Sequence, residues 1–140
     1  MILEEIVGVV ADILLAFDAE RPVHREFQPG IGPFGEPQLI RVLADRMTSR
    51  GIDAHTQRQP DLRISQEWAL EFKIVRPFGD NGKEAENWSV NMLHPYPGNV
   101  SLLSDAFKLR GLDKYEKKGL FVIGFEHAPA KINLVRSEEF

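Results

Sequence analysis

Two carboxylates and an amine near the middle of the chain have the types and spacing for chemistry on a charged substrate. Asp61 opens the segment 61–65, and Glu71 and Lys73 belong to the segment 68–75; in both segments apolar and polar residues alternate. That alternation predicts two short neighbouring strands. Side chains two residues apart on a strand share a face, so Glu71 and Lys73 project together. If the strands form a hairpin, Asp61 joins them, and two carboxylates and one ammonium group converge.

This set of groups is suited to the hydrolysis of phosphodiester bonds. Mg²⁺ or Mn²⁺ would be held by the carboxylates of Asp61 and Glu71, with the backbone carbonyl of Phe72 as a further ligand, because hard divalent cations prefer oxygen. Such a cation polarises a phosphoryl oxygen and lowers the pKa of a bound water. Lys73 would orient that water and offset negative charge in the transition state.

The arrangement resembles the PD-(D/E)XK nuclease family, the restriction-endonuclease-like proteins. Pro60-Asp61, nine intervening residues and Glu71-Phe72-Lys73 match its signature, and the order of helix, hairpin, helix and strand agrees from about residue 35 to about residue 126. The resemblance implies a mixed β-sheet flanked by α-helices and a Mg²⁺-dependent endonuclease, usually acting on DNA. It also implies a role for Glu36, on the helix before the hairpin, through a second cation or a bound water.

Each of these residues also has an ordinary structural interpretation. Glu71 and Lys73 could form a solvated strand face, Asp61 could belong to a turn, and Glu36 could complement a helix dipole. Two other functions therefore stay open: a catalytically inactive nuclease-like module that binds nucleic acid or a protein partner, and an oligomeric α/β protein whose acidic face keeps it soluble. The separation of Asp61 and Glu71 discriminates between them, because catalysis requires that the two share a cation.

The elements that must position these residues follow from periodicity and from helix start and stop signals. We expect helices over about 2–17, from Glu36 to the stop at Gly51, and from about 101 to 117, with Gly119 ending the third. After the hairpin we expect a strand over 120–125, whose continuous apolar run predicts burial on both faces, and a last strand over 131–135. This order predicts one α/β domain spanning residues 1–140, with helices flanking one sheet.

A long polar segment, about 76–99, separates the hairpin from the third helix. A segment of that length without regular structure is usually functional. Three of its side chains could stack on bases or contact phosphates, or could instead pin the segment to the protein: Trp88, His94 and Tyr96. Lys108, on the third helix, could reach a phosphate or pair with Asp105 three residues earlier.

The composition narrows the class of protein. A chain of 140 residues with 43% hydrophobic residues can form one domain with its own core. The absence of cysteine excludes disulfides and thiolate chemistry, and the four scattered histidines argue against a zinc enzyme.

The net charge of the chain and its first helix indicate which partners the protein binds and where in the cell it is found. The first helix is too short and too charged to span a bilayer, so we expect a soluble, cytoplasmic protein without a membrane partner. Its surplus of apolar residues suggests a homodimer through this helix. The net charge of −4 is mildly unfavourable for binding nucleic acid, but bound cations would change the sign of the site.

Overall fold

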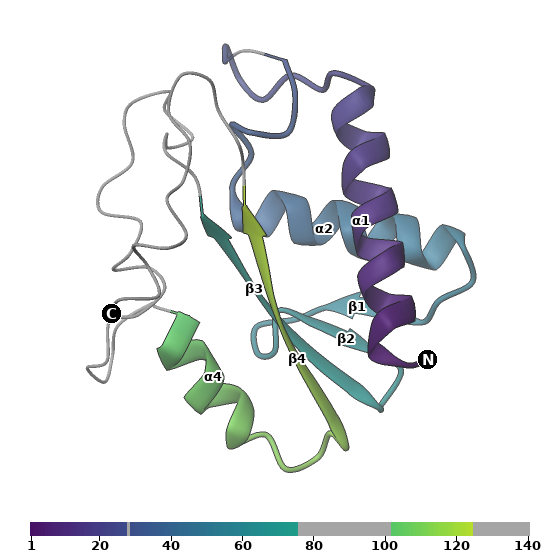
Figure 1. Cartoon of the computed structure of the whole chain (residues 1–140), viewed down its shortest axis with the longest axis vertical. Helices are drawn as coiled ribbons and strands as arrows, with labels where there is room; N and C mark the ends of the chain where they lie inside the picture. The colour runs from purple at the N-terminus through teal and green to yellow at the C-terminus, as the bar shows by residue number, and fades with distance from the viewer. Residues whose placement is uncertain (28, 76–101, 125–140) are drawn as a thin grey trace.

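The computed structural model describes residues 1–27, 29–75 and 102–124. In these residues three helices accompany a four-stranded sheet (Figure 1). The elements, in chain order, are α1 (Leu3–Ala19), α2 (Glu36–Ser49), β1 (Ala54–Thr56), β2 (Leu62–Ile64), β3 (Trp68–Val75), α4 (Leu102–Arg110) and β4 (Lys117–Gly124). The expected α/β class is confirmed, whereas the narrower restriction-endonuclease-like arrangement stays a prediction.

The sheet has the strand order β1-β2-β3-β4 and is mixed. β2 runs antiparallel to both β1 and β3, with Leu62 opposite Leu70, and the chain turns between β2 and β3 at residues 65–67, as the hairpin prediction required. β4 runs parallel to β3, with Lys73 opposite Val122. A parallel neighbour requires a crossover connection, and α4 lies within it.

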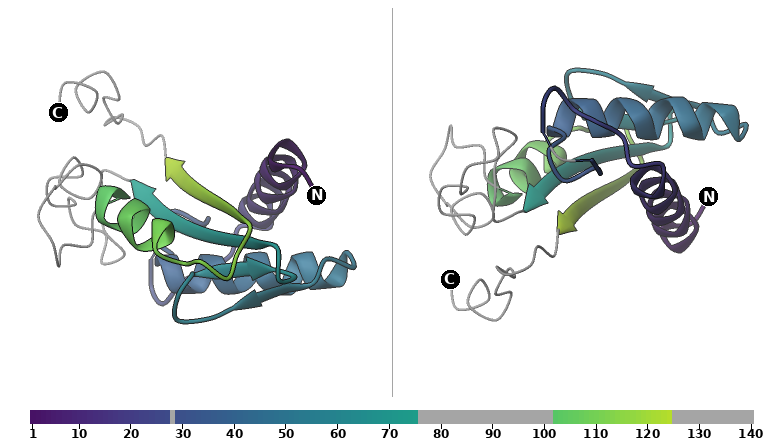
Figure 2. Two further views of the ribbon diagram at one scale, coloured as in Figure 1. Left: turned by 90° about the horizontal axis from the view of Figure 1, so that it is seen from below. Right: turned by 90° about the horizontal axis from the view of Figure 1, so that it is seen from above.

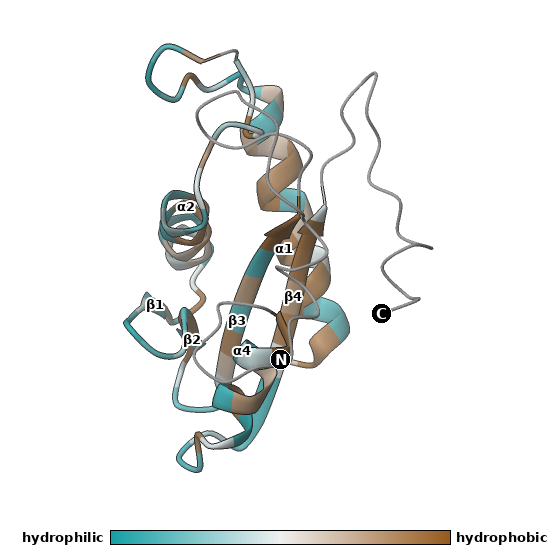
Figure 3. Ribbon diagram, turned by 90° about the vertical axis from the view of Figure 1, so that its left-hand side faces the viewer, coloured by the Kyte–Doolittle hydropathy of each residue, from teal (hydrophilic) through white to brown (hydrophobic). Residues whose placement is uncertain are grey.

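The main core lies between α1, α2 and one face of β3. The buried face of β3 is formed by every second residue, Leu70, Phe72 and Ile74, and it packs with Ile6 and Leu39 of the two helices. Phe72 stacks on Phe121 of β4 with ring centroids 5.1 Å apart. Figure 3 shows apolar residues gathered on α1, β3 and β4. The alternation read from the sequence is therefore the alternation of two faces of the sheet.

The opposite face of β3 is covered by α4. Ala69 of β3 packs there with Leu109 of α4 and with Tyr115, which precedes β4. Figure 2 shows β3 and β4 running between α4 on one side and α1 on the other. Because Glu71 and Lys73 share the face of Ala69, they point toward α4 rather than into the main core.

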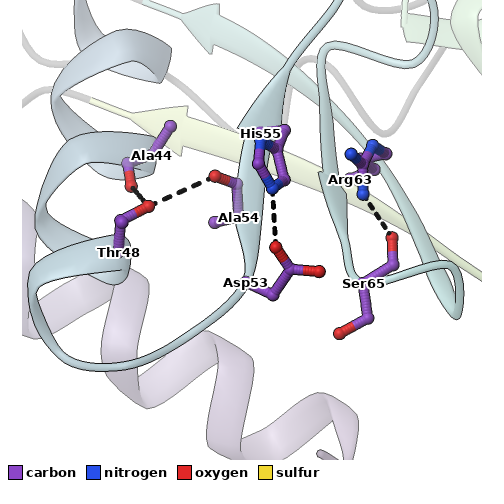
Figure 4. Close-up of polar contacts among 7 residues, drawn as sticks. All are labelled: Ala44, Thr48, Asp53, Ala54, His55, Arg63 and Ser65. Carbon is purple, nitrogen blue, oxygen red and sulfur yellow. Dashed lines mark hydrogen bonds and ion pairs between the residues drawn. The ribbon is translucent and has the colours of Figure 1, made fainter.

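The end of α2 has the predicted form. Gly51 adopts a φ of +82°, its N–H donates to the carbonyl of Thr48, and the N–H of Ile52 donates to the carbonyl of Met47. These two bonds form a Schellman motif, in which glycine is favoured because it has no Cβ. The Thr48 hydroxyl then bonds to the carbonyl of Ala54, which ties α2 to β1 (Figure 4). β1 was not predicted, since three residues are too few to show a periodic pattern.

Three predictions about the second half of the chain are wrong. The third helix ends at Arg110, not near 117, and Gly119 lies inside β4 instead of ending a helix. A Cβ on Gly119 would come within 2.8 Å of the Leu70 side chain, so the glycine serves close packing of neighbouring strands. β4 is also not buried on both faces, because Leu120 and Val122 are 37% and 44% exposed on the α4 side.

The first helix follows the predicted range closely but is not enclosed. Ile6, Val10, Ile13 and Leu14 are buried. Several other large apolar side chains at this end of the chain are exposed: Ile2, Leu3, Val7 and Leu15. In the described parts of the chain, no helix is both long and apolar enough to cross a membrane.

The remaining predictions of this kind concern other parts of the chain. The segment 76–99, its side chains Trp88, His94 and Tyr96, and the strand expected over 131–135 lie outside the described residues.

Candidate active site

The candidate site is built on the end of β3 that continues beyond its hairpin partner. β2 pairs with β3 as far as Leu70, whereas β3 extends to Val75. The backbone N–H groups of Phe72 and Ile74 on that edge therefore have no strand partner in β2. Buried backbone donors require an acceptor, and here carboxylates supply it. Asp61 Oδ2 accepts from Phe72 N–H at 2.9 Å, and Glu36 Oε1 accepts from Ile74 N–H at 2.9 Å.

These two hydrogen bonds bring together acids from different elements. Asp61 directly precedes β2, behind the fully buried Pro60, and Glu36 is the first residue of α2. Both are therefore held against β3, so Asp61 does not lie on a remote turn. The N–H and C=O of one residue point to the same edge of a strand, so the carbonyl of Phe72 lies on the edge where Asp61 is bound.

Glu71, which is buried, forms an acid pair with the half-buried Asp61. The Glu71 side chain is only 6% exposed, and it shares a hydrogen bond with the carboxyl group of Asp61. Burial first, then the hydrogen bond and the negative charges of Asp61 and Asp105, raise the pKa of Glu71 to about 8, against a smaller opposing effect of Lys108. Ionising both carboxyl groups at such close contact is unfavourable because the two negative charges repel each other. The pair therefore retains a proton near neutral pH.

Lys73 lies beside this pair, among further acidic side chains. It is 8% exposed, and its Nζ is 3.2 Å from Asp105 Oδ2 on α4 and 3.9 Å from Glu36 Oε1. Asp105 is itself 8% exposed. A buried ammonium group needs such partners, because a charge removed from water is unfavourable without an opposite charge or hydrogen bonds. α4 and α2 thus hold the lysine from two sides.

The pKa of Glu36 is raised as well. Its main cause is burial, and the negative charges of Asp61 and Asp105 act in the same direction; the hydrogen bond from Ile74 and the charge of Lys73 oppose it. The charges of the other groups of the site therefore influence the protonation of Glu36. Its place at the start of α2 also suits the helix dipole, so the ordinary interpretation and the site contact hold together.

The four residues predicted to act together do converge, and one residue was missed. Asp61, Glu71, Lys73 and Glu36 lie around one end of β3. The sequence left open an ion pair of Asp105 with Lys108; in the structure Asp105 pairs with Lys73. Its position on a helix next to the motif was the available signal, but the helix phase relative to β3 is set by tertiary packing.

Lys108 lies at the margin of the site. Its side chain is exposed on α4, yet its charge is close enough to lower the pKa of Glu71 slightly. Its predicted contact with a phosphate stays a prediction.

The donor set fits one divalent cation with a small protein ligand shell. Asp61 and Glu71 hold between them a proton, whose place a cation would take, and the Phe72 carbonyl lies on the same strand edge. Within residues 1–27, 29–75 and 102–124, no group of three or more His, Cys, Asp or Glu side chains surrounds one possible metal position. One or two carboxylates completed by water and substrate phosphate are, however, the usual ligands of Mg²⁺.

Comparison with known proteins assigns no family to the chain. No protein-family model, no curated protein and no solved structure matches the chain.

Proposed function

We propose that this chain is a metal-dependent nuclease that hydrolyses phosphodiester bonds in DNA. The observation that carries the proposal is the carboxyl pair of Asp61 and the buried Glu71, with Lys73 on the same face of β3 as Glu71. These residues and Glu36 are those for which the PD-(D/E)XK resemblance implies a role. A solvated strand face would leave Glu71 and Lys73 exposed and would not require two further acids from α2 and α4.

Asp61, Glu71 and the Phe72 carbonyl would hold Mg²⁺ or Mn²⁺. A bound cation would polarise a phosphoryl oxygen and lower the pKa of a coordinated water. Glu71 must lose its proton for this, so at neutral pH cation binding is coupled to proton release. Without a cation, ionising both Asp61 and Glu71 is unfavourable. A bound cation would offset their negative charges and make that ionisation favourable.

Lys73 would orient the attacking water and offset the negative charge that develops on the phosphate. Asp105, 3.2 Å from the ammonium group, is a positioning residue that restricts where that group can lie. Glu36 would act through a second cation or a bound water, since one of its oxygens already accepts from Ile74. Lys108 is the candidate on α4 for a contact with a neighbouring phosphate.

We further propose that the protein forms a homodimer through α1. The support is the group of exposed apolar side chains at this end of the chain, which the described residues leave uncovered: Ile2, Leu3, Val7 and Leu15. A twofold dimer would present two sites to a duplex, as cutting both strands requires.

Cleavage of supercoiled plasmid DNA with and without Mg²⁺ or Mn²⁺ tests the nuclease proposal. We expect cation-dependent nicking by the wild type and a loss of about 10²- to 10³-fold in Lys73→Ala, the usual effect of removing one group that stabilises the transition state. The matched control is Lys118→Ala. Lys118 lies on the same face of the sheet, four residues before the partner of Lys73 in β4, and its Nζ donates to the carbonyl of Arg110.

The control separates lost catalysis from lost structure. Nicking that persists in Lys73→Ala, or that falls equally in Lys118→Ala, would contradict the proposed role of Lys73. A folded wild type that neither nicks DNA nor binds the cation by calorimetry would favour the catalytically inactive module that binds nucleic acid or a protein partner.

A further inference from the structure

A pocket of about 310 Å³ adjoins the candidate site between the first turns of α2 and the segment that joins β1 to β2. Glu36 and Asp61 line it, so the pocket and the carboxylates of the site share a wall. Its other polar lining comes from Arg41, Thr56 and Gln57. The volume is at the lower end of the range of small-ligand sites, about 300–1,000 Å³, which suits a single nucleotide unit better than a larger group.

Arg41 is the cationic side chain among the lining residues. It lies five positions after Glu36 on α2 and is exposed, and it makes no side-chain hydrogen bond or ion pair with any residue that the structure describes. A guanidinium group presents a planar fork of donors that matches two phosphate oxygens. An arginine at the wall of a pocket, with its donors uncommitted to the described protein, is therefore available to a ligand.

The opposite wall is held in place. The Gln57 side chain donates to the Tyr115 hydroxyl at 3.0 Å and to the carbonyl of Gln59 at 3.1 Å. Tyr115 is itself buried against Ala69 and Leu109. Gln57 is thus fixed to the body of the domain, and the pocket wall is pre-formed rather than assembled by the ligand.

The charges of the pocket define what it accepts. Two carboxylates and one guanidinium give the lining a formal charge of −2 + 1 = −1, so an anion is repelled from the acidic end. A cation held by Asp61 reverses that repulsion, and an anion is then attracted from both ends. The pocket is therefore suited to a phosphate when the cation is present and is unsuited to it when the cation is absent.

We propose that this pocket binds one phosphate group, with its sugar, of the nucleic-acid strand that is cut, and that Arg41 holds that phosphate. The inference rests on the proposed nuclease function and adds to it a substrate-positioning residue. Arg41 places the strand relative to Asp61 and Lys73 without taking part in the chemistry itself.

The test measures binding, with cleavage prevented by Lys73→Ala in every protein used. The probe is a short fluorescein-labelled single-stranded DNA, titrated in Mg²⁺ at several salt concentrations and followed by fluorescence anisotropy. Adding Arg41→Ala should weaken binding about tenfold or more, as expected for lost hydrogen bonds between charged groups. The slope of log K against log salt should fall by about 0.7, the value for one phosphate contact to a single strand.

Arg50→Ala is the matched control. Arg50 is exposed and caps the other end of the same helix, about 14 Å along its axis from Arg41, and its removal changes the net charge equally. Arg41→Lys should recover the salt slope but only part of the affinity, because it keeps the charge and loses the fork. Without Mg²⁺, Arg41→Ala and Arg50→Ala should behave alike.

The position of the contact can be located by replacing single phosphates with neutral methylphosphonates. One replacement should weaken binding to the protein with Arg41 and cost nothing further in Arg41→Ala, because both changes remove the same contact.

Equal affinities and salt slopes of Arg41→Ala and Arg50→Ala would overturn the subsite. If Lys73-dependent nicking by otherwise wild-type protein persisted, the nuclease proposal would stand. If the wild type neither bound the oligonucleotide nor nicked plasmid, both proposals would fall together.

Discussion

The protonation of Glu71 makes the stability of the fold dependent on pH, and replacing this residue by glutamine should remove the dependence. In the folded protein its pKa is about 8, compared with an ordinary value of 4.5. Between these values the folded chain keeps a proton that the unfolded chain has released. The free energy of unfolding therefore falls as pH rises, by about 1.4 kcal/mol per unit. From about pH 5 to about pH 7 the loss is about 3 kcal/mol.

Urea denaturation followed by tryptophan fluorescence between about pH 5 and about pH 8 measures this effect. Glu71→Gln keeps the shape and a hydrogen-bond donor next to Asp61 but cannot ionise. We expect the variant and the wild type to have similar stability at the acid end. The variant should then be the more stable by about 3 kcal/mol near pH 7. The difference between the two proteins isolates Glu71 from every other titrating group.

Glu67→Gln is the control with the opposite sign. The hydrogen bond from Lys117 lowers the pKa of Glu67 in the turn before β3. The stabilisation from a lowered pKa is complete above the unfolded value and is lost only as pH falls through the folded value. Its contribution should stay constant over the range in which that of Glu71 changes.

Mg²⁺ provides the second arm of this experiment. A cation that replaces the proton should stabilise the wild type most at the alkaline end, and it should have little effect on Glu71→Gln. A stability difference between the two proteins that stays flat across the pH range would refute the inference that Glu71 is held protonated by its surroundings. Equal stabilisation of both proteins by Mg²⁺ would refute its role as a ligand.

Two further predictions concern the lysine partner and the first helix. Asp105→Ala should lower the free energy of unfolding by about 3 kcal/mol in urea denaturation, because it removes from the buried Lys73 the closer of its two described acidic partners. It should also reduce kcat more than it changes KM. An effect no larger than that of the exposed control Asp113→Ala would contradict the positioning role. Leu15, which is 70% exposed, tests the homodimer. Leu15→Glu should reduce the mass in sedimentation from about twice the 15.9 kDa of the chain to that of a single chain, while its far-ultraviolet circular dichroism stays that of the wild type. A wild type that sediments as a monomer would rule the dimer out.

The sequence was sufficient to predict that Glu71 and Lys73 share one face of the strand, because this depends only on the two-residue period of a strand. Any extended strand over Trp68–Val75 directs these two side chains to one side and Phe72 to the other. The end of α2 is equally local, since Gly51 can adopt a positive φ that other residues resist. These features need no knowledge of distant parts of the chain.

The end of α4 and the place of Gly119 could not be predicted in this way. The residues after Arg110 are compatible with a helix by composition. However, the segment Lys117–Gly124 forms a strand because it pairs with β3. Gly119 is a helix terminator by type and a close-packing residue by position, because the Leu70 side chain lies where a Cβ would be. The competing interpretations differ only in contacts with another strand.

The features of the candidate site divide in the same way, into those that follow from the sequence and those that depend on tertiary contacts. Which side chains near the motif carry charge follows from the sequence alone, and so does the shared face of Glu71 and Lys73. Tertiary packing determines where β2 ends relative to β3, so that Asp61 and Glu36 accept hydrogen bonds from the N–H groups left without a partner in β2. It also brings Asp105 against Lys73 and buries Glu71. Charge type is a property of the residue, whereas a shifted pKa arises from the burial and neighbouring charges that distant segments supply on folding.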